Sequence, residues 1–293
     1  MHAPTLEAMA SRVELPVMRR LLSLMEGRHG SLRAGRGGEF LDMAEYKPGD
    51  DVKDIDWLAS ARQARPVVKR FEATANLQVV LVVDTGRSMG ALAPSGETKE
   101  EVALLACQMI AWMSTVRGDQ VGLVAGDARR LRQMPARSGN SHAETVLRRI
   151  GEDIDLSSPP SDVGRLLTRA LAATRRRSLV VLVSDATQPD PSLDALVKRM
   201  RVRHEMLVVS VADAPPTQFA RGTRVVDVDN GPLPDFVLGD PLLARESAEA
   251  ARVRADAVSA MLAHRGVTQV SVSSGDEVAR ALVRALERGA RVH

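Results

Sequence analysis

Short runs of apolar residues recur after residue 77 and alternate with stretches of helical periodicity. The runs are rich in valine and leucine, which is typical of strands buried on both faces of a parallel sheet. They occupy residues 78–83, 120–125, 178–184 and 205–211, and a further strand, TQVSVS, is expected at 268–273. Helices are expected between them at about 99–116, 141–150, 163–174, 241–265 and 276–288, with a short polar strand at 129–134. The pattern predicts an open, mainly parallel, doubly wound α/β sheet of the Rossmann-like kind.

The first 76 residues follow a different pattern. A helix is expected near 14–26, and a segment rich in glycine and arginine follows it. The letters KPGDD are a turn signal, and PVVKRFE, ending at Glu72, is typical of a strand. We expect a helical segment over 1–26, a second segment over 27–76 that packs on the main domain, and the main domain over 77–293. The proline-containing stretch 212–240 is expected to be a loop-rich excursion within that domain.

Composition narrows the class of protein. Apolar residues make up 44% of the chain and aromatic residues only 2%, and the net charge is +3. So few aromatic residues and so small a charge disfavour nucleic-acid binding. A single cysteine, Cys107, excludes an intramolecular disulfide. The N-terminus lacks a signal-peptide pattern, and the longest apolar stretch, 102–116, is shorter than the roughly 20 residues of a membrane span. We therefore expect a cytoplasmic protein with no membrane anchor.

Polar side chains follow two of the predicted buried strands. Asp84 ends the first strand, with Gly86 and Ser88 just beyond it, and Asp185 ends the strand at 178–184. Ser161 stands in a loop ahead of a helix. Ligands of open parallel sheets collect at the carboxyl ends of the strands, and Mg²⁺ prefers oxygen ligands, so these residues suggest a cation site. The alternative is that both aspartates cap the helices that follow them.

The letters VVLVVDTGRSMG resemble the DxSxS motif of a von Willebrand factor A domain, whose metal-ion-dependent adhesion site adds a threonine and a second aspartate. The resemblance assigns Asp84 to the first aspartate, Ser88 to the second serine, Ser161 to the threonine and Asp185 to the second aspartate. Gly86 replaces the first serine, which removes one metal ligand. The expectation is a degenerate site that binds Mg²⁺ weakly or not at all. Gly86→Ser should then tighten Mg²⁺ binding, and Asp84→Ala should abolish it.

The segment before the first buried strand extends the resemblance. It is similar to the signature of the bacterial MoxR-associated von Willebrand A-like family, a family of unknown function. The matching residues are Tyr46, Pro48-Gly49-Asp50, Ile55-Asp56-Trp57, Ser60-Ala61-Arg62 and Phe71-Glu72. The resemblance implies a partner of a MoxR-type AAA+ ATPase in protein maturation, metal insertion or stress responses. The dense turn and charge pattern of this segment predicts that it is fixed against the main domain, with Trp57 mostly buried.

The functional hypothesis is a non-enzymatic protein-binding adaptor. Its partner would be the ATPase or a client protein, contacted through Arg87, Asp162 and Thr187. Arg87 also offers a positive charge in place of a metal. The alternatives are a metal-independent scaffold that binds through the signature segment, and a hydrolase using Ser88, which lacks both a nucleophile-elbow pattern and a histidine base. The acidic cluster 50–56 lacks the glycine and the closing glutamate of a calcium loop.

Overall fold

The computed structural model describes residues 39–46, 55–63, 65–72, 77–219, 222–229, 231–234 and 240–290. The described residues fall into two compact units, one within residues 29–76 and one within residues 77–293. The helix expected near 14–26 and most of the acidic cluster 50–56 lie outside the described residues. Among the described residues, no helix has both the length and the hydrophobicity to span a membrane.

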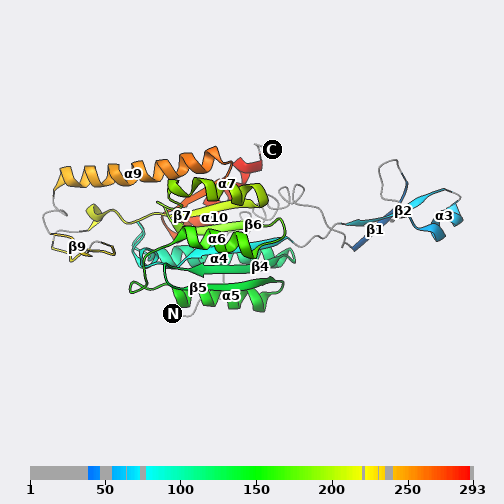
Figure 1. Ribbon diagram of the computed structural model, residues 1–293, viewed down its shortest axis with the longest axis horizontal. Helices are drawn as coiled ribbons and strands as arrows, with labels where there is room; N and C mark the ends of the chain where they lie inside the picture. Colours follow the sequence, from blue (N-terminus) through cyan, green and yellow to red (C-terminus); the bar gives the residue numbers. More distant parts are fainter. Residues whose placement is uncertain are drawn as a thin grey trace. The chain divides into compact units, whose positions relative to one another are not determined.

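A six-stranded sheet forms the centre of the larger unit, in the spatial order β10-β7-β6-β3-β4-β5 (Figure 1). All neighbouring pairs are parallel except β4 and β5, which are antiparallel. The strands are β3 (Gln78–Asp84), β4 (Gln120–Gly126), β5 (Leu131–Arg137), β6 (Leu179–Asp185), β7 (Glu205–Val211) and β10 (Thr268–Val272). The predicted α/β fold with an open, mainly parallel sheet is confirmed.

The burial of the strands follows their sequences. Every residue of β6 is buried, and β3 is buried from its second residue to Asp84, as continuous apolar runs predict. In contrast, β5 alternates between half-buried and exposed side chains. An edge strand has one neighbour only, so a polar sequence is suited to this position.

Helices cover both faces of the sheet. Leu166, Met200 and Leu262, from three helices, share one core cluster with Val80 and Val82 of β3. These three helices are α6 (Val163–Ala173), α7 (Asp194–Arg203) and α9 (Pro241–His264). The other face is covered by α4 (Lys99–Val116), α5 (Asn140–Asp153) and α10 (Gly275–Ala290), of which α4 packs against both of the others. The sheet is therefore doubly wound.

The strand order reverses direction between β3 and β6. From β3 the chain continues to β4 and β5 on one side, whereas β6 leads to β7 and β10 on the other. At such a switch point the two connections leave in opposite directions and open a crevice at the carboxyl ends of the strands. Asp84 and Asp185 are the last residues of these two neighbouring strands.

Between β7 and β10 the chain makes an excursion beyond the carboxyl edge of the sheet. A small hairpin pairs β8 (Val226–Asp227) with β9 (Gly231–Pro232). Helix α9 follows; it buries Val258 and Leu262 near its end, whereas residues 245–254 are exposed. Figure 1 shows the first half of α9 extending past the sheet, at the same end of the molecule as β9.

The smaller unit contains an antiparallel pair, β1 (Glu39–Glu45) and β2 (Val67–Glu72), and the short helix α3 (Trp57–Gln63). The Asp56 carboxylate caps α3 by accepting hydrogen bonds from the amides of Leu58 and Ala59, both at 3.0 Å. The strand expected at 66–72 is present as β2. Within this unit Trp57 is not buried: its side chain is 70% exposed on a short helix with no buried residues, so its expected burial depends on packing against the main domain. Packing of this unit on the main domain stays a prediction.

Candidate functional site

An aspartate stands at or just beyond the end of each of four parallel strands. Asp84 ends β3, Asp185 ends β6, Asp127 follows β4, and Asp213 lies two residues after β7. The first three are buried, and the Asp213 side chain is half exposed. A buried carboxylate is stable only if hydrogen-bond donors or a cation compensate its charge. The compensating groups differ among the four aspartates.

Asp84 is the least compensated of the four. Its Oδ1 atom accepts a hydrogen bond from the Gly86 amide at 2.9 Å, whereas its Oδ2 atom is buried and has no hydrogen-bond partner among the described residues. Burial raises the pKa of Asp84 to about 6, and the nearby charge of Asp185 adds to this rise. The Gly86 amide and the Ser161 hydroxyl oppose it in part. The ionised form of Asp84 is thus less favourable than that of an exposed carboxyl group.

Ser88 and Ser161 are brought together as the motif predicted. Their hydroxyl oxygens lie 3.1 Å apart, although 73 residues separate them in the chain. The loop that carries Ser161 is held by the Pro159 carbonyl, which accepts a hydrogen bond from the Arg87 amide at 3.0 Å.

Gly86 lies against this same loop. A Cβ atom at Gly86 would lie 2.3 Å from Ser161 Oγ and 2.5 Å from the Ser161 amide nitrogen, well inside any non-bonded contact. The space of the missing serine side chain is therefore taken by Ser161. Gly86→Ser does not simply restore a ligand, as the sequence had suggested, because the loop would have to move to admit it.

The Asp185 carboxylate is paired with a cation of the chain itself, the ammonium group of Lys99, which we call its resident cation. Lys99 Nζ donates hydrogen bonds to Asp185 Oδ2 and to Asp213 Oδ1, and the lysine side chain is fully buried. The other oxygen, Asp185 Oδ1, accepts from the Thr187 amide at 2.7 Å and from its hydroxyl at 2.6 Å. Burial opposes ionisation of Asp185, but the Lys99 charge and the hydrogen bonds to the carboxylate together outweigh burial and lower the pKa of Asp185 to about 2. Partial burial and the negative charge of Asp185 raise the pKa of Asp213 to about 6.

These contacts decide how well the residues fit Mg²⁺. Both oxygens of Asp185 are engaged by Lys99 and Thr187, and position 86 supplies no oxygen. What remains is one oxygen of Asp84 and two hydroxyls that contact each other. Within the described ranges, no three His, Cys, Asp or Glu residues come together as metal ligands. The residues therefore do not fit the ion of a complete adhesion site, and the Mg²⁺ hypothesis stays untested.

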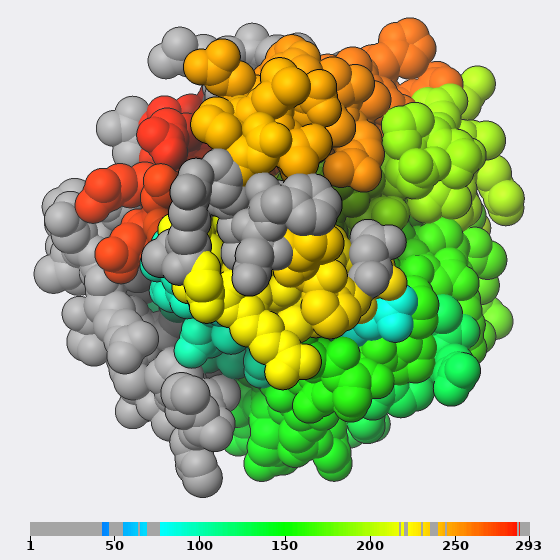
Figure 2. Space-filling view, turned by 90° about the vertical axis from the view of Figure 1, so that its left-hand side faces the viewer, coloured from blue at the N-terminus to red at the C-terminus, as the bar shows by residue number. Residues whose placement is uncertain are grey.

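The residues expected to contact a partner have different local roles. Asp162 caps α6 by accepting a hydrogen bond from the Arg165 amide at 2.8 Å, and Thr187 holds Asp185. Only Arg87 points its charge outward: its Nε lies 2.8 Å from Asp229 Oδ1 in the turn between β8 and β9. Figure 2 views the carboxyl edge end-on, with the segment that contains this hairpin (yellow) across the middle of the face.

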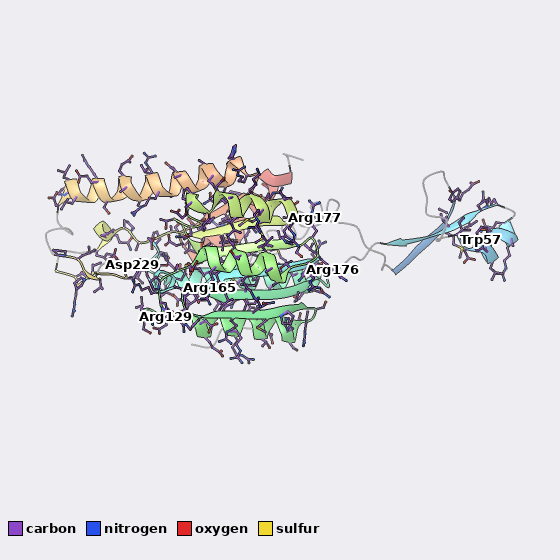
Figure 3. All side chains as sticks on the ribbon, viewed as in Figure 1. Trp57, Arg129, Arg165, Arg176, Arg177 and Asp229 are labelled. Carbon is purple, nitrogen blue, oxygen red and sulfur yellow. The ribbon has the colours of Figure 1, made fainter. Side chains whose placement is uncertain are left out.

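Further arginines surround this edge. Arg130 Nε lies 2.8 Å from the buried Asp127 carboxylate, and Arg165 Nη1 donates to the Asp127 carbonyl oxygen at 3.1 Å. Arg129, beside them, is exposed. Figure 3 shows Arg129 and Asp229 at one end of the main unit and Arg176 at the other, where the strands begin.

Lys99 and Asp213 were missed from the sequence, although signals for both exist. Asp213 follows a buried strand, as Asp84 and Asp185 do, but an alanine stands between Asp213 and the last strand residue. Lys99 directly follows Thr98, the N-cap of α4. A cation is disfavoured at the positive end of a helix dipole, so a lysine at this position indicates a nearby anion.

The larger unit is thus an α/β domain in which Asp84, Ser88, Ser161 and Asp185 gather at a switch point of the sheet. The chain belongs to the family described as "Protein of unknown function DUF58", whose model matches residues 42–256. Uncharacterized protein Rv1480 of Mycobacterium tuberculosis and Uncharacterized protein Mb1516 of Mycobacterium bovis are each 31% identical to it over 260 residues. In each case the match covers 86% of this chain and 80% of the relative.

Two solved structures are also similar. One is an aerotolerance-related membrane protein from Bacteroides fragilis, with 16% identity and a TM-score of 0.43, covering 72% of this chain and 99% of that chain. The other is a von Willebrand factor type A protein from Catenulispora acidiphila, with 12% identity and a TM-score of 0.40. It covers 76% of this chain and 44% of that chain.

Proposed function

We propose that this protein is a non-enzymatic adaptor that binds a partner protein at the carboxyl edge of its main sheet. The switch point between β3 and β6 is where this class of sheet binds ligands. The loops that meet there are tied together by side-chain contacts such as the one between Ser88 and Ser161. A pre-formed surface of this kind loses little entropy on binding.

The observation that carries the proposal is the ion pair between Arg87 and Asp229. Arg87 lies between Gly86 and Ser88 of the strand-end motif, and its side chain already binds a carboxylate. Its side chain is 32% exposed and that of Asp229 is 54% exposed, so the pair is open to water. Exposed pairs contribute only about 0–1 kcal/mol, so an acidic side chain of a partner can replace Asp229 at little cost. We therefore propose that the partner offers a carboxylate on an exposed segment, as Asp229 does within the chain.

The proposed partner is a MoxR-type AAA+ ATPase, together with its client proteins, acting in protein maturation or stress responses. This part rests on the resemblance of residues 43–72 to the MoxR-associated family signature and of the strand-end motif to von Willebrand A domains, which bind other proteins. Membership of the DUF58 family agrees with it but specifies no partner.

A second candidate surface lies on the smaller unit. Trp57 and Leu58 are neighbours on α3 and are 70% and 66% exposed. Large exposed apolar side chains that lie together often mark a protein-binding surface. This observation favours the alternative in which the signature segment, rather than the strand-end motif, binds the partner without a metal.

A hydrolase has the least support. Among the described residues, the Ser88 hydroxyl contacts the Ser161 hydroxyl and forms no hydrogen bond to a histidine that would act as its base.

Co-purification tests the proposal. The tagged full-length protein would be co-expressed with a MoxR-type ATPase of the same genome and recovered with ATP, with ADP or without nucleotide. Arg87→Ala should lower recovery of the ATPase about tenfold, whereas Arg176→Ala, an exposed arginine at the opposite end, should leave it unchanged. Loss in Trp57→Ala with no effect of Arg87→Ala would favour the second surface. No complex in any nucleotide state would overturn the ATPase partnership.

A further inference from the structure

Lys99 is a fully buried lysine at the first position of a helix. Thr98 caps this helix with Glu101 in a capping box, and the Lys99 amide donates a hydrogen bond to the Ala91 carbonyl at 2.8 Å. The backbone of Lys99 is thus fixed both by the capped start of the helix and by its hydrogen bond to Ala91. Both the absence of water and the positive end of the helix dipole disfavour an ammonium at this place.

Two carboxylates from neighbouring strand ends compensate the ammonium. Asp185 ends β6, Asp213 follows β7, and β6 and β7 are paired in parallel. Burial alone would lower the pKa of Lys99, but the charges of Asp185 and Asp213 outweigh it and raise that pKa above its usual value. The lysine is therefore charged, and it joins the start of α4 to the carboxyl ends of two strands.

We infer that the Lys99 ammonium is the resident cation of this carboxyl edge, and that it holds Asp185 in place where an adhesion site uses a divalent metal ion. The inference concerns what holds the edge together. It can be tested on the isolated protein, and the result does not depend on whether a partner binds at this edge.

The contacts of Asp185 carry the inference. Lys99 binds Oδ2, and Thr187 donates two hydrogen bonds to Oδ1, so both carboxylate oxygens are engaged within the chain. A divalent ion beside Asp185 would also lie close to the ammonium, and two positive charges in a buried site repel each other strongly.

The other half of the site agrees with this assignment. Lys99 lies close enough to Asp84 to favour its ionised form, although burial has the larger effect on that carboxyl group. Position 86 has no side chain, and the Ser161 hydroxyl takes the space in which a ligand serine would stand. One lysine thus neutralises the strand-end carboxylate on the β6 side, and its charge also favours the ionised form of Asp84.

Thermal unfolding of the full chain in Mg²⁺ and in EDTA tests the inference. The wild-type Tm should be the same, within about 1 °C, in both, because a ligand raises stability only if it binds the folded state. Lys99→Met keeps the length of the side chain but leaves two carboxylates without their cation. It should lower the Tm by on the order of 10 °C, whereas Lys198→Met, an exposed lysine on α7, should not change it.

A double variant separates the charge from the shape of the lysine. Lys99→Met with Asp185→Asn removes both charges together and should recover at least about half of the Tm lost in Lys99→Met alone. If the single variant does not fold, the double variant and the wild-type comparison still decide the question.

Three results would overturn the inference. The first is a saturable rise of the wild-type Tm with Mg²⁺, and the second is a Lys99→Met protein as stable as wild type. The third is a double variant no more stable than the single one. None of them depends on capture of the ATPase. Failure of the proposed function and failure of this inference are therefore separate outcomes.

Discussion

Four aspartates occupy equivalent places at the carboxyl edge, and each is stabilised in its own way. Asp127 accepts hydrogen bonds from two amides and a guanidinium. Asp185 and Asp213 share the ammonium of Lys99. Asp84 has one amide donor and an unpartnered oxygen within the described part of the chain. The four carboxyl groups therefore differ in how well their ionised forms are stabilised.

Asp84 makes the stability of the protein depend on pH. Its pKa is about 6 in the folded protein, against an ordinary value of 3.8. The folded state therefore binds more protons than the unfolded state between these values, and stability should fall as the pH rises from about 4 to about 6. Asp84→Asn removes this loss. The variant should be more stable than wild type by about 1–3 kcal/mol at pH 8, and this gain should shrink towards pH 4.

Urea unfolding of both proteins at pH 4.5 and pH 8, in EDTA, measures this difference. Other carboxyl groups with a raised pKa, such as Asp119, titrate equally in both proteins and cancel. A variant less stable than wild type at pH 8 would contradict the account, because it would mean that a donor or a cation stabilises the ionised Asp84.

At the scale of elements, sequence patterns predicted the main sheet well. Strands β3, β4, β6 and β7 contain apolar runs that are too short for helices and rich in valine. The polar edge strand β5 lies within three residues of its expected place. Helix α7 was missed because it buries only Val197 and Met200 and is otherwise strongly polar. The hairpin of β8 and β9 was missed because strands of two residues leave no periodic pattern.

The site was predicted less completely than the fold. Asp84, Ser88, Ser161 and Asp185 could be placed because strand ends and their loops are visible in the sequence. The contact of Lys99 with Asp185 joins residues 86 positions apart, so no local pattern reveals it. The steric conflict at Gly86 likewise depends on the path of a loop that only the fold determines.

The hairpin of β8 and β9 makes an element-scale prediction. Asp229→Ala removes its ion pair with Arg87 and should speed amide hydrogen exchange in residues 226–229 by up to about fivefold, since the pair ties the turn to the sheet edge and exposed pairs contribute about 0–1 kcal/mol. The Tm should change little, because the pair is exposed to water. Glu249→Ala, which breaks a comparable exposed pair with Arg252 on α9, is the matched control. Equal exchange of the hairpin in wild type and Asp229→Ala would contradict the role given to this pair.

At the scale of the whole molecule, two surfaces are candidates for the site that binds the partner protein. The carboxyl edge of the larger unit combines Arg87 with loops held by internal contacts, whereas the smaller unit exposes Trp57 and Leu58. We assign docking of the partner to the carboxyl edge, because Arg87 there already forms an ion pair with the Asp229 carboxylate. Membership of the DUF58 family covers both units and does not decide between them.

Hydrogen–deuterium exchange of the full chain, alone and in complex with the ATPase, distinguishes the two surfaces most directly. The account predicts slower exchange on binding in residues 85–92, 158–162 and 186–190, which form the carboxyl-edge loops, and no change in residues 175–178 at the opposite edge. Protection confined to residues 55–72 of the smaller unit, with the carboxyl-edge loops unchanged, would contradict it.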